Sequence, residues 1–254
     1  MTFVDRIGMT LLHFVWEGTL ICAIYACIRK MVGCACRPNV RYVLACAALG
    51  TLVCAPFLTF FLLFSPVSVD SSALSGLVHL APTDTLTLHG FAFALLAPVQ
   101  EHHGNLLPWV VTVWFAGVFV LSVRLARAWL VAERTLSAHI RSAPPDWQET
   151  LLKLGHTIGV TRRVRLMVSS RVDTPTVIRW LKPVVLVPVG ALTGMPANQV
   201  EALLAHELAH IRRHDYLVNV LQGVAEAFLF YHPAIWWISR NIRKERELCC
   251  DASL

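Results

Sequence analysis

The sequence predicts a mainly α-helical membrane protein, in which three transmembrane helices are followed by a small α+β domain. Of the 254 residues, 56% are hydrophobic and 15% are charged, whereas soluble domains average about 45–50% and about 25%. So few charges could not cover the surface of a soluble domain of this length, and the mean hydropathy of +0.59 agrees. The composition argues against an ordinary soluble enzyme, a disordered chain or a highly charged nucleic-acid-binding face.

Three apolar stretches are long enough to cross a bilayer, which requires about 20 residues. They cover about residues 7–28, 42–64 and 106–130. The first is not expected to be a cleaved signal peptide, because no basic region precedes it and Arg29-Lys30 ends it. A further apolar run, Leu86–Val99, is short for a span, and we expect an interfacial or re-entrant segment there. If that run did cross, the downstream domain would lie outside the cell.

Basic residues predict the orientation of the spans, since Lys and Arg are concentrated in cytoplasmic loops. Residues 65–105 contain no Lys or Arg, whereas the first loop and the segment after the third span are rich in them. We therefore expect the N-terminus outside and the downstream domain in the cytoplasm. The basic residues concerned are Arg29, Lys30, Arg37, Arg41, Arg124, Arg127, Arg134 and Arg141.

The chain changes character after the third span, which divides it into a membrane anchor, residues 1–130, and a cytoplasmic-side domain, residues 131–254. Capping and turn residues predict a helix from Asp146 to about Ile158, ended by Gly159. Pro196 then opens a long helical pattern. Two β-branched runs bounded by turn residues predict short strands at Val164–Ser169 and Val184–Val187.

A zinc-binding pattern occurs in the long helix, at His206-Glu207-Leu208-Ala209-His210. Residues four apart lie on one face of a helix, so both histidines can bind one metal ion. Glu207 would lie beside the metal without ligating it, where it can accept a proton from bound water. A pattern of three fixed residues also occurs by chance on surface helices, so the motif alone leaves both interpretations open.

A catalytic zinc needs a third protein ligand and an open coordination position. Downstream, Glu247 and Asp251 are four residues apart on a predicted helix and share a face. Glu247 can complete a site of two histidines and one glutamate. Asp251 can accept the second N–H of a ligand histidine and orient its ring.

Other metal-ligating residues nearby fit this site less well. His214 lies about 12 Å along a straight helix from His206 and cannot reach the same ion. Glu245 faces roughly the opposite side of its helix from Glu247. Cys249 and Cys250 stay open as soft ligands, although thiolates suit a structural site better than a hydrolytic one.

The segment Tyr216–Ile238 is apolar enough to resemble a fourth span. A span there would place Glu247 and His206 on opposite sides of the bilayer, so that both could not bind one ion. We expect instead a buried or membrane-hugging helix with a bend near Pro233. The aromatic and histidine side chains of this segment suit either the membrane interface or core packing; they are Tyr231, His232, Trp236 and Trp237.

Six motifs occur together in the sequence: Leu11–Gly18, Thr174–Pro188, Leu204–Asp215, Phe230–Trp237, Glu245–Glu247 and Cys250–Asp251. Together they resemble the BlaR/MecR-type antirepressor membrane zinc metallopeptidases, the peptidase part of β-lactam sensor-transducers. Two features depart from that family: Arg179 stands where relatives usually have glycine, and the chain ends at Leu254, before the further span and sensor domain of true sensors. It is therefore expected to be a fragment or a short member without β-lactam sensing.

The resemblance implies His206, His210 and Glu247 as ligands of one Zn²⁺ per chain, Glu207 as the general base, and a gluzincin-like peptidase domain. It also implies a multi-pass protein of the bacterial cytoplasmic membrane that cleaves a protein substrate at the cytoplasmic face. That substrate would be a transcriptional repressor or the peptidase itself. The lipid bilayer is the other expected partner, direct nucleic-acid binding is not expected, and a homo-oligomer stays open.

Two other functions compete with an antirepressor peptidase. A non-catalytic transducer or scaffold would use zinc only for stability, but it would need no base at Glu207 and would close the fourth coordination position. A quality-control peptidase of the membrane would share the chemistry and differ in substrate. The group that stabilises the oxyanion is not identified by the sequence, and His232, Tyr231 and Arg240 are candidates.

Overall fold

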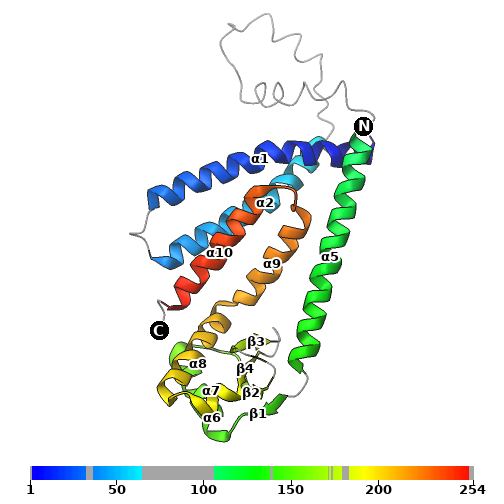
Figure 1. Cartoon of the computed structure of the whole chain (residues 1–254). Coiled ribbons are helices and arrows are strands. Elements are labelled where there is room, and N and C mark those ends of the chain that lie inside the picture. Colours follow the sequence, from blue (N-terminus) through cyan, green and yellow to red (C-terminus); the bar gives the residue numbers. More distant parts are fainter. Residues whose placement is uncertain are drawn as a thin grey trace, which may run out of the picture. The chain divides into compact units, whose positions relative to one another are not determined.

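The computed structural model describes residues 2–32, 37–64, 106–137, 140–170, 172, 174–178 and 183–251. Within these ranges, three helices are long and apolar enough to cross a membrane: α1 (Phe3–Val32), α2 (Pro38–Phe64) and α5 (Leu107–Ser137) (Figure 1). They precede a small mixed α/β region, which confirms the predicted fold class. The run Leu86–Val99, the rest of residues 65–105, and Arg179 lie outside the described residues.

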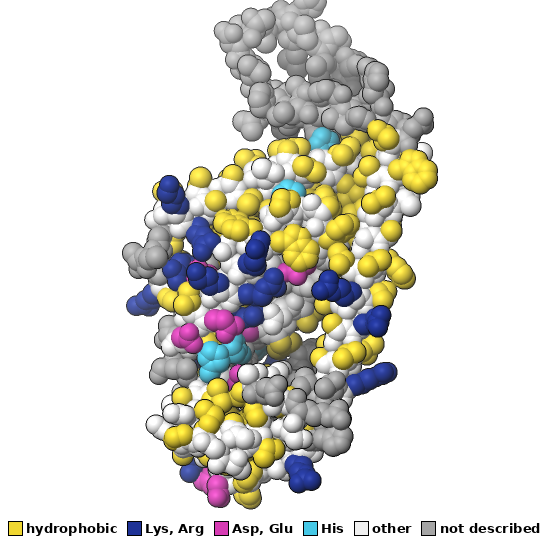
Figure 2. Space-filling view, in the orientation of Figure 1, with side chains coloured by type: hydrophobic (Ala, Val, Ile, Leu, Met, Phe, Trp, Pro, Cys, Tyr) yellow, Lys and Arg dark blue, Asp and Glu magenta, His cyan; other side chains and the backbone are white. Residues whose placement is uncertain are grey.

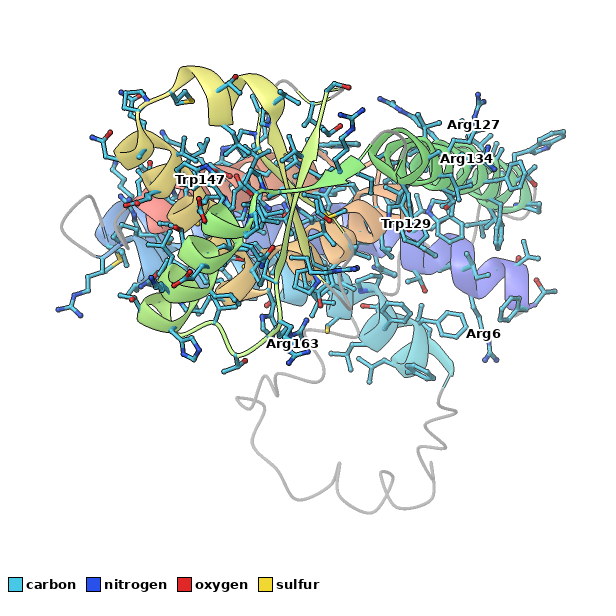
Figure 3. The ribbon with its side chains drawn as sticks, turned by 90° about the horizontal axis from the view of Figure 1, so that it is seen from below. Arg6, Arg127, Trp129, Arg134, Trp147 and Arg163 are labelled. Carbon is cyan, nitrogen blue, oxygen red and sulfur yellow. The ribbon has the colours of Figure 1, made fainter. Side chains whose placement is uncertain are left out.

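The long helices expose the apolar side chains that a bilayer would cover. Exposed hydrophobic residues occur along all three helices, and many are visible on the face in Figure 2. The last part of α5 turns basic, and Arg127 and Arg134 project outward from it (Figure 3). This sequence of apolar and then basic surface is typical of a helix that leaves the membrane.

The described residues form two compact units. The first comprises Met1–Glu17 and Cys54–Ala116, and the second comprises Gly18–Val53 and Gly117–Leu254. In the first unit the Thr59 hydroxyl on α2 donates a hydrogen bond to Glu17 Oε1 on α1, 2.7 Å away. The acidic residue inside the first span therefore has a partner on the neighbouring helix. The division into an anchor ending at residue 130 and a domain after it stays a prediction.

A four-stranded sheet lies in the second unit, with the order β1-β2-β4-β3. The central strands are parallel to each other, and both edge strands are antiparallel to their neighbours. The two predicted strands are confirmed as the central pair, whereas the three-residue edge strands had no sequence signal. The strands are β1 (Ile140–Ser142), β2 (Arg165–Ser169), β3 (Thr176–Ile178) and β4 (Val184–Pro188).

Helices α6 (Pro145–Ile158), α7 (Val189–Gly194) and α8 (Ala197–Arg213) gather around this sheet (Figure 1). As predicted, α6 ends at Gly159, whose positive φ of 82° ends the helix in a left-handed turn. One row of α8 packs into the core with α6, β2 and β4, at spacings of four, four and three residues. That row is Val200, Leu204, Leu208 and Ile211.

The segment expected to be one bent helix is two helices, α9 (Asp215–Phe228) and α10 (Pro233–Asp251), which pack side by side. The proline therefore starts a new helix instead of bending one. Gln222 on α9 donates to the Ser239 carbonyl on α10 at 3.0 Å, and Glu226 pairs with Arg243 at 3.1 Å. The outer face of α9 exposes apolar side chains: Leu217, Val220, Leu221, Val224 and Phe228.

The turn between α9 and α10 packs against two glycines of the long helices. A Cβ atom at Gly18 of α1 would lie 2.8 Å from His232 Nε2, and one at Gly117 of α5 would overlap the Phe230 ring. His232 is buried, and its Nδ1 accepts a hydrogen bond from the Ala234 N–H at 3.1 Å. For His232, core packing is thus the interpretation that the contacts favour.

Candidate metal centre

Helix α8 presents His206 and His210 on one face, because four residues complete about one turn. Its apolar row faces the sheet, so the two imidazoles are left on another face and are only partly buried. Their Nε2 atoms lie 3.2 Å apart. Two nitrogen donors at this separation can share a single metal ion.

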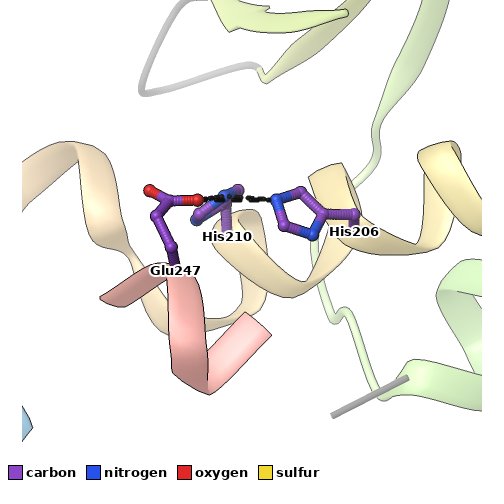
Figure 4. Close-up of side chains that lie close together, drawn as sticks. All are labelled: His206, His210 and Glu247. Carbon is purple, nitrogen blue, oxygen red and sulfur yellow. Dashed lines mark hydrogen bonds and ion pairs between the residues drawn. The ribbon is translucent and has the colours of Figure 1, made fainter. Parts of the chain in front are cut away.

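Helix α10 brings Glu247 to the same point (Figure 4). Its Oε2 atom lies 3.7 Å from the Nε2 atom of each histidine. Ligands of a tetrahedral zinc at bond lengths of about 2.0–2.1 Å lie about 3.3 Å from one another. The triangle of His206, His210 and Glu247, which we call the metal centre, therefore fits zinc in donor type and in size.

A second carboxylate, Asp215, fixes the ring of His210. The helix α8 ends at His214, whose φ of 59° is the one positive value among the described non-glycine residues. This turn reverses the chain and places Asp215 Oδ2 2.8 Å from His210 Nδ1. When Nδ1–H donates to that carboxylate, the Nε2 lone pair is left for the metal. Sequence reasoning missed this role; an acid directly after the helix end was its only signal.

The predicted orienting residue Asp251 lies near the other ligand histidine. Its Oδ1 atom is 3.5 Å from His206 Nδ1, and its side chain is 67% exposed. Arg246 Nε lies 3.5 Å from Glu247 Oε1, and the same guanidinium donates a hydrogen bond to Asn219 on α9. Each of the three ligands thus has a charged group beside it, on the side away from the centre of the triangle.

The other residues considered from the sequence have contacts elsewhere. Cys250 Sγ lies 3.3 Å from His210 Nδ1, on the nitrogen that faces away from the metal centre. Glu245 pairs with arginines of α1 and α2. Among the oxyanion candidates, His232 packs on α1, and Arg240 Nε donates to the Trp236 carbonyl. Tyr231 contacts the Phe230 ring edge to face.

The electrostatic environment shifts the pKa values of Glu207 and His210 for different reasons. Burial raises the pKa of Glu207 to about 7, His210 lowers it and Glu247 raises it. Burial lowers the pKa of His210, but its hydrogen bonds with Asp215 and Cys250 outweigh this and raise the pKa to about 10. Zinc would compete with protons for this imidazole, since metal ligands must be deprotonated.

Comparison with known proteins assigns most of the chain to one family model. The model described as BlaR1 peptidase M56 matches residues 39–254, which include α2 except its first residue, the sheet, and the helices α8 and α10. The matched residues therefore contain the whole metal centre and its carboxylate partners.

Individual relatives are distant. The regulatory protein BlaR1 of Bacillus licheniformis is 28% identical over 105 residues, or 40% of this chain and 17% of that protein. The methicillin resistance mecR1 protein of Staphylococcus aureus is 25% identical over 93 residues, or 37% and 16%. Protease HtpX of Hydrogenovibrio crunogenus is 30% identical over 140 residues, or 52% and 46%. The chain thus matches less than half the length of each of these relatives.

Removal of any one ligand should abolish stoichiometric zinc binding. We expect about one zinc per wild-type chain, and little zinc in His206→Ala, His210→Ala or Glu247→Ala, because two donors alone hold the ion weakly. Elemental analysis after dialysis measures this. The exposed histidine His156 on α6 offers a matched control, and His156→Ala should keep its zinc. Zinc at the wild-type level in all three ligand variants would rule out this metal centre.

The two carboxylates that face the ligand histidines should differ in importance. We expect Asp215→Asn to weaken zinc binding by about 10- to 100-fold, the usual effect of losing such a partner. Asp251→Asn should have a smaller effect, because its contact is 3.5 Å rather than 2.8 Å and lies in solvent. Competition titrations against a chelator give both affinities. Wild-type affinity in Asp215→Asn would contradict the role assigned to Asp215.

Proposed function

Because the chain belongs to the BlaR1 peptidase M56 family, we propose that it is an integral-membrane zinc metalloendopeptidase that cleaves a protein substrate at the cytoplasmic membrane face. The observation that carries the proposal is the triangle of two imidazole nitrogens and one carboxylate oxygen. Glu207 follows the first of these histidines on α8 and interacts electrostatically with His210 and Glu247. Three protein ligands leave a fourth position for water or substrate, as in catalytic zinc sites.

In this mechanism His206 and His210 would hold the ion through Nε2, and Glu247 would hold it through Oε2. Bound zinc would supply Lewis acidity toward the scissile carbonyl and lower the pKa of a bound water. Glu207 accepts the proton of the attacking water on its carboxylate and passes it to the amine that leaves. Asp215 and Asp251 keep the two imidazoles in the orientation that directs Nε2 inward.

The names of two relatives support the substrate class that we propose. The relative from Bacillus licheniformis is named a regulatory protein, and the relative from Hydrogenovibrio crunogenus a protease. We propose a role in signal transduction, with a transcriptional repressor or the chain itself as substrate, and no direct contact with nucleic acid. A quality-control peptidase would use the same residues on other membrane proteins.

The distribution of basic residues supports an N-terminus outside and the metal centre on the cytoplasmic side. Arg124, Arg127 and Arg134 follow the apolar part of α5 and are exposed. Residues 65–105, between the second and third spans, lack Lys and Arg altogether. A cytoplasmic repressor could reach a peptidase in this orientation only.

Glu207→Gln should abolish cleavage without loss of zinc, because the amide cannot accept the proton but is not needed as a ligand. We expect a fall of at least about 100-fold, followed as self-cleavage or as cleavage of an unfolded protein by the detergent-purified chain. Glu201→Gln changes an exposed glutamate of the same helix and should behave as wild type. One zinc with no cleavage in wild type or variant would favour a non-catalytic transducer instead.

Reporter fusions should establish the orientation. Green fluorescent protein fused after residue 254 should fluoresce and alkaline phosphatase at the same place should be inactive, because the domain that follows α5 would be cytoplasmic. Fusions within residues 65–105 should give the opposite pair of signals. An active phosphatase after residue 254 would show that the metal centre lies outside.

A further inference from the structure

Two adjacent residues near the start of α2 contact the two segments that carry the metal centre. The Tyr42 hydroxyl donates a hydrogen bond to Asp215 Oδ1 at 3.2 Å. Arg41 Nε lies 3.0 Å from Glu245 Oε2. Asp215 begins α9 directly after the histidine helix α8, and Glu245 lies on α10. One turn of a membrane helix therefore contacts both of the segments that bring residues to the metal triangle.

Tyr42 is linked through Asp215 to the predicted ligand His210. Asp215 Oδ1 accepts the hydrogen bond from the Tyr42 hydroxyl, and Asp215 Oδ2 lies 2.8 Å from His210 Nδ1. The carboxylate is 3% exposed, and Tyr42 is 9% exposed. Arg213 lies 4.4 Å over the Tyr42 ring, and its Nε is 3.8 Å from Asp215 Oδ1. The plane of the carboxylate, and with it the His210 ring, is thus held from the α2 side.

Arg41 pairs with Glu245, which lies two residues before the predicted ligand Glu247 on α10. Glu245 is 2% exposed and has two cationic neighbours, Arg41 and Arg29, the latter at 3.8 Å. Arg29 also donates to Asn241 Oδ1, one turn earlier on α10, at 2.6 Å. A buried carboxylate is strongly destabilising once it loses its cations. Rotation or sliding of α10 against α1 and α2 would break these pairs and displace Glu247.

We infer that Arg41 and Tyr42 are positioning residues that couple membrane helix α2 to the metal centre, Tyr42 through Asp215 and Arg41 through Glu245. A displacement of α2 would act on both ligand-bearing segments at once. The inference rests on the proposed zinc site. It assigns these two side chains a role that plain packing would not require, because apolar residues fill such positions without the cost of burying charge.

Zinc affinity and the visible spectrum of the Co²⁺-loaded chain test the Tyr42 contact. We expect Tyr42→Phe to weaken zinc binding by about 3- to 10-fold, less than loss of a group that touches the ligand itself. The Co²⁺ absorption bands should also shift, because the His210 ring turns. Tyr25→Phe removes the hydroxyl of another buried tyrosine, which contacts Trp237 edge to face, and should match wild type in both measurements.

A double-mutant cycle tests whether Tyr42 acts through Asp215. If it does, Tyr42→Phe should cause no further loss of zinc affinity in an Asp215→Asn background. An equal loss in both backgrounds would overturn this route. Thermal unfolding of each metal-free variant in detergent shows whether it is folded.

The Arg41 contact has its own pair of variants. Arg41→Met should weaken zinc binding, and Arg41→Lys, which keeps the charge, should recover most of that loss. Arg37→Met, at an exposed arginine just before α2, is the matched control. If Arg41→Lys lost as much zinc affinity as Arg41→Met, the idea that Arg41 acts through its charge on Glu245 would be overturned.

The outcomes separate this inference from the proposed function. A wild-type chain that binds neither zinc nor Co²⁺ would overturn the zinc peptidase itself. Normal binding in wild type, with unchanged affinity and spectrum in Tyr42→Phe and Arg41→Met, would overturn only the coupling through α2.

Discussion

The convergence of α8 and α10 on one point is the constraint on which the rest of this structure depends. Two nitrogens and one oxygen must lie 3.2–3.7 Å apart, although none of them gains from burial in an apolar core. A functional site of this kind has to be held within about 0.5 Å by its surroundings. The sheet holds α8 through Leu204 and Leu208, and buried isoleucines such as Ile238 hold α10.

Helix α9 transmits this constraint between the two ligand helices. At its start the left-handed turn at His214 sets Asp215 against His210. Along its length, Gln222 and Glu226 bind it to α10, and the turn that follows it packs on the glycines of α1 and α5. The helix is therefore a spacer whose two ends are both fixed, and the distance between α8 and α10 follows from its geometry.

The parts of the site that follow local rules could be predicted, and the parts that need long-range contacts could not. His206 and His210 follow from helical spacing, and Glu247 from its spacing to Asp251 and from the family resemblance. The role of Asp215 could not be predicted, because its position depends on a positive φ at His214. A positive φ is usually signalled in a sequence by glycine, and here a histidine adopts it. Tyr42 lies 173 residues from Asp215 in the sequence. Arg41 was visible only as a positive charge that indicates a cytoplasmic loop.

Two basic residues of the predicted anchor have a second role, because they also contact the segment that carries Glu247. Arg29 and Arg41 satisfy the charge rule for a cytoplasmic loop, and they also neutralise Glu245 on a ligand helix. A chain that began after residue 130 would keep all three predicted metal ligands but would leave Glu245 buried without these two cations and Asp215 without Tyr42. The boundary that hydropathy draws between anchor and peptidase therefore does not coincide with a boundary in the polar contacts that support the metal centre.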